Sequence, residues 1–471
     1  MKMGNEVEWR IKATGDGSLE ILVPERFGVE RIQHWILGLG LKLLKFPKKA
    51  WKLGVNDPRK FIHAIKVAIA LTLVSLFYYV KPLYEGVGGN AMWAVMTVVV
   101  LFQYTAGETI SRTINRICAT SIAGLLAIVV QWVASRAGDH VEPIIVGVSL
   151  FMLASAATFS RFIPIIKARF DYGAMIFILT YSLISISGYR ADELLDMGLQ
   201  RIFTIVIGAS LCIITSITIC PVWAGQELHF SIIAKMDKLA NSLDGCVAQY
   251  FIDQTSYVSD EEYDKKLLGY KCVLSSKEAE DSMANFARWE PAHGQFRFRH
   301  PWKQYLKVGA SMRSCATCID ALLGCVNLEN KDPSDMKEQI GDVSLRLSAN
   351  CAGVIREIAK TSRNMTRSSC VDILVEEMNN TAQELQEVLK SNNPINNAAN
   401  NPTKAHGPPQ LVLMETFQLL TLASLILEIS ARVEDIVKDV EQLAELAHLL
   451  PATCVKPLNQ CQDLEDPCSQ N

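Results

Sequence analysis

Six long apolar segments, separated by short polar stretches, fill most of residues 61–225. A helix that crosses a bilayer needs about 20 mostly apolar residues, within a range of roughly 17 to 25. Helices of soluble proteins rarely run so long without a charge, and the last five segments contain no Lys, Arg, Asp or Glu. We therefore predict six transmembrane helices rather than the buried core of a soluble protein. They cover residues 61–80, 86–107, 117–135, 143–160, 172–189 and 202–225.

From Gln226 onward, apolar residues recur at helical spacing among charged ones, as Val433, Ile436 and Val440 do. Neither half shows the alternation and turn residues typical of a sheet. The pattern predicts amphipathic helices at about 226–255, 260–287, 302–327, 334–362, 369–391 and 411–450. The predicted fold class is an all-α membrane protein, with six transmembrane helices followed by a cytosolic helical domain.

These patterns divide the chain into a cytosolic N-terminal segment (1–60), a six-span transmembrane domain (61–225), a cytosolic helical domain (226–450) and a mobile tail (451–471). Within the first segment, Phe27 to Gly54 interleaves apolar and basic residues, which predicts a basic amphipathic helix at the inner leaflet. Residues 392–410 are rich in Asn and Pro and predict a flexible loop inside the cytosolic domain.

Composition agrees with a membrane protein, because the 471 residues have a mean hydropathy of +0.17 and 49% are apolar. Residues 1–225 carry 22 Lys and Arg against 15 Asp and Glu, a net charge of +7. Residues 226–471 carry 24 against 34, a net charge of −10. No basic groove with interleaved aromatic residues is present, so nucleic acid is not an expected partner.

Orientation follows from the basic residues in the short loops, which stay on the cytosolic side. Lys and Arg gather before the first span, between the second and third, and between the fourth and fifth. The opposite loops balance their few cations with acidic residues. We therefore predict that both termini are cytosolic.

Cations close to membrane depth are the strongest functional signal, since a charge at the centre of a span costs about 2.5 to 3.5 kcal/mol. Lys66 lies about one turn inside the first span, and Glu108, Arg112 and Arg116 share one helical face, so Glu108 can pair with Arg112 and influence gating. Such cations either line an electropositive pathway for anions or merely snorkel to lipid phosphates and fix the topology. We place these residues in an anion pathway: Lys66, Arg112, Arg116, Arg161 and Arg201.

Common catalytic and metal-binding motifs are missing from the sequence. It contains no phosphate-binding Gly-rich loop, no nucleophile elbow and no His-Glu-x-x-His, so we expect neither an enzyme nor a cofactor. Cys315 and Cys318 have redox or metal spacing, but they lie in an apolar helical run without a second pair, which favours core packing. His293 and His300 flank an aromatic and basic stretch that could bind zinc or an anion, although a structured loop between helices is the preferred interpretation.

Four runs of sequence stand out: Trp93-Ala-Val-Met-Thr-Val-Val-Val100, Arg112-Thr-Ile-Asn-Arg116, Cys220-Pro-Val-Trp-Ala-Gly-Gln-Glu-Leu-His229 and Trp289-Glu-Pro-Ala-His-Gly294. These runs resemble the plant aluminium-activated malate transporter family, and within it the guard-cell quick-activating (R-type) anion channel branch. The resemblance covers nearly the whole chain, and its most specific part is the Trp-Glu-Pro-x-His-Gly run. It assigns Trp93 and Thr97 to a motif of the second span, and Arg112 and Arg116 to the basic entry of the third.

The resemblance implies a homodimeric plant anion channel that passes malate, chloride, nitrate or sulfate passively, with gating by voltage and by malate. It implies a role in stomatal closure at the plasma membrane, with the vacuolar membrane as the alternative and a regulatory kinase as a candidate partner. The cytosolic half would be a dimerising platform, in which Trp289 and Pro291, with Glu290 and His293, form a helix junction near the membrane. Gln103 stands where an acidic residue is expected in many relatives, which argues against activation by aluminium.

Two other functions remain open. A coupled organic-anion exporter would need an ion or proton partner and usually an intramembrane acid, for which Glu108 is the nearby candidate. A membrane-tethered sensor or scaffold would use the spans only as an anchor. Six spans with cations at their mouths exceed what anchoring requires, so a passive channel is preferred.

Overall fold

The computed structural model describes residues 11–13, 19–21, 54–55, 57–79, 91–138, 140–188, 194–251, 267–294, 296, 300–326, 335–367, 370–391 and 409–451. By its internal contacts the chain divides into two units, residues 1–69 and 70–471. The sequence predicted the domain boundaries at other positions, 60/61, 225/226 and 450/451, and these stay predictions.

The first unit contains a short antiparallel pair of strands, β1 (Ile11–Ala13) and β2 (Leu19–Ile21), in which Ile11 lies opposite Ile21. Three residues in each strand are too few to give an alternating pattern, so the sequence did not predict them. Helix α2 (Pro58–Tyr79) begins in this unit and covers the first predicted span. Apart from Gly54, the amphipathic helix predicted for 27–54 lies outside the described residues.

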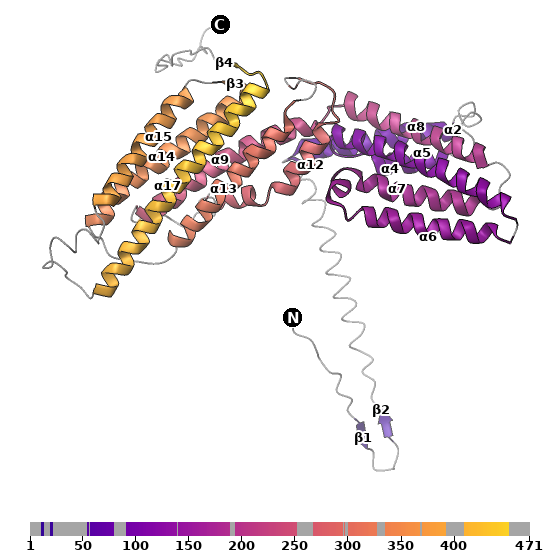
Figure 1. The fold of residues 1–471 in the computed structure, drawn as a ribbon, viewed down its shortest axis with the longest axis horizontal. Helices are drawn as coiled ribbons and strands as arrows, with labels where there is room; N and C mark the ends of the chain where they lie inside the picture. The colour runs from indigo at the N-terminus through magenta and orange to yellow at the C-terminus, as the bar shows by residue number, and fades with distance from the viewer. Residues whose placement is uncertain are drawn as a thin grey trace, which may run out of the picture. The chain divides into compact units, whose positions relative to one another are not determined.

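Each of the other five predicted spans overlaps a helix: α4 (Ala91–Leu101), α5 (Ala106–Arg136), α6 (Glu142–Ser160), α7 (Pro164–Gly188) and α8 (Leu194–Thr218) (Figure 1). α5 packs on α6, α7 and α8, and α4 packs on α8. In the described part of the chain, three segments are long and apolar enough to cross a membrane: Ala106–Arg136, Glu142–Ser160 and Pro164–Ile186. Shorter apolar helical stretches lie at Met92–Leu101 and Ile202–Thr218, and the full count of six spans stays a prediction.

Helix α5 begins earlier than the third predicted span, at Ala106 rather than at residue 117. The apolar run starts only after Arg116, so hydropathy places the boundary there. The helix itself begins where Thr105 caps it, because the Thr105 hydroxyl accepts a hydrogen bond from the Glu108 N–H at 3.3 Å. Arg112 and Arg116 therefore lie on the helix itself.

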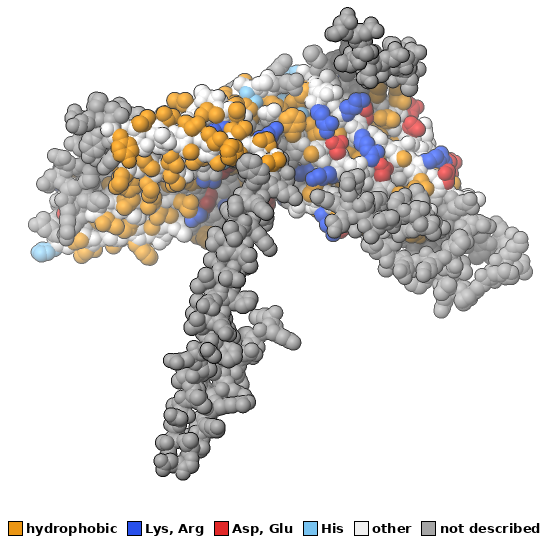
Figure 2. Space-filling view, turned by 180° about the vertical axis from the view of Figure 1, so that it is seen from behind, with side chains coloured by type: hydrophobic (Ala, Val, Ile, Leu, Met, Phe, Trp, Pro, Cys, Tyr) orange, Lys and Arg blue, Asp and Glu red, His pale blue; other side chains and the backbone are white. Residues whose placement is uncertain are grey.

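Large hydrophobic side chains are exposed on the helices of the membrane half, as expected for surfaces that face lipid. Leu125 on α5 is 67% exposed, Phe151 on α6 is 70% exposed and Ile165 on α7 is 69% exposed. No residue of α6 is buried. Figure 2 shows hydrophobic side chains gathered over these helices, whereas charged side chains are interspersed over the helices that follow.

Those following helices form the C-terminal helical half. They are α9 (Ala224–Phe251), α11 (Tyr270–Leu274), α12 (Lys277–Ala287), α13 (Trp302–Val326), α14 (Asp335–Arg363), α15 (Cys370–Ser391) and α17 (Pro409–Leu446). α14 packs against α9 and α15, and α13 packs against α17. A two-residue parallel pair, β3 (Thr366–Arg367) and β4 (Leu450–Pro451), follows α14 and α17 respectively.

The helices predicted for this half agree with the structure in every case but one. The single helix predicted at 260–287 is wrong, because Ser275 and Ser276 separate α11 from α12. The Ser276 hydroxyl donates to the Val273 carbonyl at 2.6 Å, and serine readily replaces a helical backbone bond in this way. Cys315 is fully buried in the core of this half, which confirms its predicted packing role.

Candidate functional site

The start of α5 is fixed by hydrogen bonds from outside the helix. The first N–H groups of a helix have no partner within it. Here the Ala106 N–H donates to the Val222 carbonyl at 2.8 Å, and the Gly107 N–H donates to Glu290 Oε1 at 3.2 Å. α5 is therefore tied both to the segment before α9 and to the loop after α12.

Two arginines follow on α5 and meet the same tyrosine of α7. Arg112 pairs with Glu108 at 2.8 Å, as the i, i+4 spacing predicted, and its guanidinium lies 5.5 Å from the centre of the Tyr172 ring. Arg116 is buried, with 7% of its surface exposed, and Nη1 donates to the Tyr172 hydroxyl at 3.2 Å. Arg116 has a neutral contact where Arg112 has an ionic one, so its charge is not offset by an ion pair among the described residues.

Donors without acceptors surround Arg116. Arg116 Nε and the hydroxyls of Thr113 and Thr120 are buried, and none has a hydrogen-bond partner in the described part of the chain. The three residues are spaced i, i+3 and i+7, which places them on one face of α5. Other threonines of this half, such as Thr215, donate to the carbonyl four residues earlier, at 2.7 Å from Leu211. Buried polar groups left unpaired in a native protein require an explanation, of which an absent water or ion is one.

The other proposed pathway cations differ in their surroundings. Arg161 forms a two-contact ion pair with Asp171 of α7, with distances of 2.7 and 3.3 Å, and its side chain is 35% exposed. Lys66, on α2, is only 2% exposed. The side chain of Arg201 lies outside the described residues. Arg161 thus adds little net charge, because Asp171 offsets it.

The second-span motif has an internal structural role. Thr97 is fully buried on α4, and its hydroxyl donates to the Trp93 carbonyl at 2.7 Å. Gly208 of α8 approaches this site closely, because an added Cβ would lie 2.9 Å from the Ala94 carbonyl oxygen. These contacts account for α4 packing tightly on α8.

Glu290 connects the membrane half to the C-terminal helical half. Its carboxylate accepts the N–H groups of Gly107, at the start of α5, and of Ala224 and Gly225, at the start of α9, at 3.2, 2.6 and 3.1 Å. Burial raises the pKa of Glu290, while the three N–H donors act in the opposite direction. Each helix N-terminus carries roughly half a positive charge, so two of them together nearly balance one carboxylate.

Glycine is required where Glu290 meets the two helices. A Cβ added to Gly107 would lie 2.6 Å from the Phe286 carbonyl oxygen and 2.7 Å from Glu290 Oε1. A Cβ added to Gly225 would overlap the ring of Trp302. Both glycines therefore permit a close approach that a larger residue would block.

The sequence-based hypothesis places Trp289, Glu290, Pro291 and His293 at a helix junction near the membrane, and this role stays a prediction. The Trp289 side chain is 39% exposed. Pro291 contributes its carbonyl, which accepts from His293 Nδ1 at 2.9 Å, and the His293 ring stacks on Trp223 at 4.1 Å. Glu290 makes the contacts that join the halves, and His293 supports the loop.

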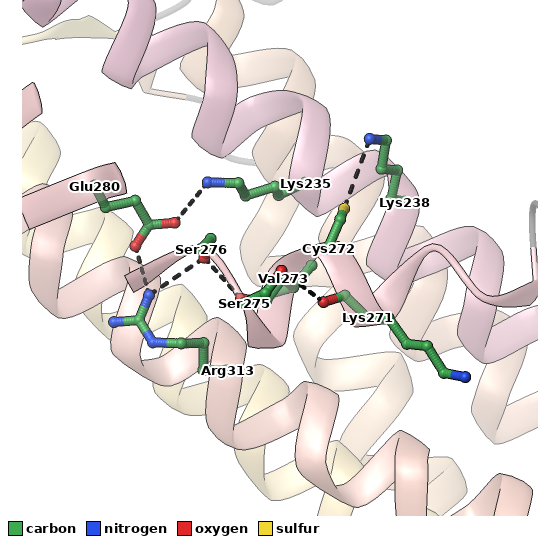
Figure 3. A network of polar contacts seen from close by, with 9 residues as sticks. All are labelled: Lys235, Lys238, Lys271, Cys272, Val273, Ser275, Ser276, Glu280 and Arg313. Carbon is green, nitrogen blue, oxygen red and sulfur yellow. Dashed lines mark hydrogen bonds and ion pairs between the residues drawn. The ribbon is translucent and has the colours of Figure 1, made fainter. Parts of the chain in front are cut away.

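A buried ion-pair network holds α12, the helix that leads into Glu290. Glu280, only 2% exposed, pairs with Lys235 of α9 at 2.7 Å and with Arg313 of α13 at 2.5 Å (Figure 3). Burial disfavours the ionised carboxylate, but hydrogen bonds from Lys235, Ser276 and Arg313 outweigh it and lower the pKa of Glu280. The sequence analysis missed this residue, although Glu280 lies on the same helical face as the buried Ala284 and Ala287, where a charge needs a partner.

His293 and His300 lie in the stretch between α12 and α13, where both make ring contacts. Among the residues that the structure describes, no group of three or more His, Cys, Asp or Glu side chains could hold a metal ion. His293 and Phe296 instead form a backbone bridge, with N–O distances of 3.1 and 2.9 Å. The structured loop preferred from the sequence stays a prediction, because residues 295 and 297–299 of this stretch lie outside the described residues.

Apolar helices with exposed hydrophobic faces, tied to a polar helical half, define an integral membrane protein. A family profile described as "Aluminium activated malate transporter" matches residues 51–412. The chain belongs to this family, as its sequence predicted.

The sequence of this chain aligns with those of curated relatives over most of their length. The chain is 46% identical over 470 residues to aluminum-activated malate transporter 10 of Arabidopsis thaliana, with 94% of each protein covered. It is 42% identical over 409 residues to transporter 2 of the same plant, covering 86% of this chain and 79% of the relative. It is 38% identical over 426 residues to transporter 1 of Triticum aestivum, with 88% of each covered.

Proposed function

We propose that this protein is a passive anion channel of a plant membrane that conducts malate and the inorganic anions chloride, nitrate and sulfate. The observation that carries the proposal is the face of α5 where Arg116, Thr113 and Thr120 hold buried donors without acceptors. The names of the relatives, all malate transporters, support the choice of an organic anion.

An anion that enters a membrane loses hydration, which N–H and O–H donors can replace. Arg116 supplies the positive charge, and the two threonine hydroxyls supply neutral donors on the same face. Conduction also requires release, and a site with one cation and neutral donors binds more weakly than a ring of several cations. Arg112 is held by Glu108, so this pair is a candidate gate rather than a permanent binding site.

The remaining cations of the proposed pathway attract anions through the electrostatic potential of the whole entrance. Lys66, Arg161 and Arg201 retain this role as a proposal. Arg161 has the smallest expected effect, because Asp171 neutralises it.

The contact of Glu108 with Arg112 favours passive conduction over coupled export. A coupling acid must be able to change its charge or its ligand during transport. Glu108, the candidate for that role, is engaged by Arg112 at 2.8 Å. Coupled export of organic anions remains the second candidate function, and a change in reversal potential with a proton or sodium gradient would favour it.

Finer features of the proposal follow the family resemblance. The channel is a homodimer with both termini in the cytosol of a plant guard cell, at the plasma membrane, where voltage and malate gate it and a kinase regulates it during stomatal closure. The alternative is a malate channel of the vacuolar membrane. Normal dimeric current after deletion of residues 226–471 would contradict the dimerising role of the C-terminal helical half.

Voltage clamp of cells that express the chain tests the central proposal. When malate, nitrate or sulfate replaces chloride on one side, the reversal potential should follow the anion gradient and ignore proton and sodium gradients.

Arg116→Ala and Arg112→Ala should reduce the anion current without loss of surface protein. Arg136→Ala, an exposed arginine in the last turn of the same helix, is the matched control and should leave the current unchanged. Unchanged conductance in both Arg112→Ala and Arg116→Ala would place the pathway elsewhere.

A further inference from the structure

A cavity of about 630 Å³ lies beside Glu290, outside the proposed anion pathway. We call it the junction cavity. It is lined by the end of α12, the loop that follows, the start of α13 and Leu446 of α17. Its volume is within the range of roughly 300 to 1,000 Å³ that is typical of small-molecule sites.

The charges of the lining residues favour an anionic ligand. Arg288 and Lys303 line the cavity, and both side chains are exposed. Neither forms an ion pair with another described residue. Glu290 also lines it, but its carboxylate accepts three backbone N–H groups at the N-termini of two helices, which offset its charge. Among the described residues of the lining, two cations therefore dominate.

Aromatic rings form part of the remaining wall. Phe296 and Trp302 lie with their ring centres 5.4 Å apart, and Trp302 lies 4.7 Å from His300. Burial lowers the pKa of His300 to about 4, so this wall is neutral at the pH of the cytosol. A ligand that fits would combine negative groups with a short carbon skeleton that can lie on the rings.

We propose that the junction cavity binds a small organic dicarboxylate, with its carboxylates paired to Arg288 and Lys303 and its carbon chain against Trp302 and Phe296. The site is separate from Arg116 and does not depend on the proposed conduction. Because Glu290 is shared between the cavity and the starts of α5 and α9, the bound dicarboxylate lies beside the contacts that join the two halves of the protein.

Calorimetric titration of malate into the full-length protein, in nanodiscs of neutral lipid, tests the site directly. Saturable binding should persist in Arg116→Ala. In Arg288→Gln/Lys303→Gln it should weaken at least tenfold. Lys307→Gln removes one positive charge one turn further along α13, at a residue that pairs with Asp439, and should bind within twofold of the unaltered protein.

Several outcomes would overturn this proposal. One is an absence of saturable malate binding, and another is binding that Arg116→Ala abolishes while Arg288→Gln/Lys303→Gln retains it. Equal competition by inorganic sulfate would show a general anion site rather than a dicarboxylate site. Loss of malate binding in nanodiscs that contain phosphatidylserine would assign the cavity to a lipid headgroup. Since Arg288 and Lys303 are exposed, the double variant should fold, and an unchanged melting temperature confirms it.

Discussion

Arg112 and Arg116 lie one helical turn apart on α5, yet their surroundings give them different chemistry. Glu108 neutralises Arg112, whereas Arg116 is buried against a tyrosine hydroxyl and retains an unpaired Nε. The sequence spacing placed both on one face and predicted the Glu108 pair. It could not distinguish a neutralised arginine from one that is available to a ligand, since that depends on Tyr172 of another helix.

The hydroxyls beside Arg116 give a test in which function and stability move in opposite directions. Thr113→Val and Thr120→Val replace an unpaired buried hydroxyl by a methyl group of similar shape, which should raise the free energy of unfolding by about 1 to 3 kcal/mol. The same changes should lower malate current severalfold, because a donor is lost from the pathway. Thermal denaturation and voltage clamp measure the two effects.

Thr215→Val is the matched control for those variants. Thr215 is equally buried, but its hydroxyl already donates to the Leu211 carbonyl. This variant should not gain stability and should keep its current. If Thr113→Val and Thr120→Val behaved in the same way, the unpaired hydroxyls would have no role in conduction.

Two buried histidines predict how stability depends on pH. His229 and His300 both contact the Tyr305 hydroxyl, at 3.0 and 3.2 Å, and burial lowers the pKa of each from 6.5 to about 4. They stay neutral in the folded protein but bind protons readily when unfolded. Stability is therefore complete above pH 6.5 and falls as the pH drops toward 4, by up to about 3 kcal/mol for each histidine.

Chemical denaturation of the full chain at several pH values, followed by tryptophan fluorescence, measures this loss. His300→Phe should remove about half of the pH dependence between 6.5 and 4. Tyr305→Phe retains both imidazoles, so it should lower stability at every pH without moving the range. Equal pH profiles for His300→Phe and the unaltered protein would exclude His300 as a source of the effect.

At the scale of elements, α12 and the loop after it connect the two halves of the second unit. Glu280 anchors α12 to α9 and α13, and Glu290 then reaches the first residues of α5 and α9. Apolar spacing predicted the helices themselves. The residue-level links between them were not visible, because Lys235, Glu280 and Arg313 are far apart in sequence and meet only when three helices pack.

Glu290→Gln tests the junction. A carboxamide offers one oxygen where the carboxylate offers two, and its NH₂ group would face an N–H donor. We expect the free energy of unfolding to fall by about 1 to 3 kcal/mol and the voltage dependence of the current to change, because α5 is released from α9. Differential scanning calorimetry and current–voltage curves provide the measurements.

Glu278→Gln is the control. Glu278 lies exposed in the first turn of α12, and its substitution removes the same charge as Glu290→Gln does. It should leave both measurements unchanged. A Glu290→Gln protein with normal stability and normal gating would show that the three N–H contacts are not needed to join the helices.

At the scale of the whole molecule, the distribution of charge predicts how the chain crosses the membrane. An epitope inserted at Gly138, between α5 and α6, should be reached by antibody on intact cells. Tags at either terminus should be reached only after permeabilisation, because the basic loops stay on the cytosolic side. A terminal tag that is accessible on intact cells would reverse the predicted orientation.

The sequence by itself determined the helical fold class, the position of a helix at each apolar segment and the family, because hydropathy, helical periodicity and short motifs are local properties of the chain. Only the tertiary structure decided which charges matter. A tyrosine hydroxyl sets the role of Arg116, two cations set that of Glu280, and two helix N-termini set that of Glu290. Each of these partners comes from a distant part of the chain. The junction cavity likewise exists only where the stretch from the end of α12 to the start of α13 meets Leu446 of α17.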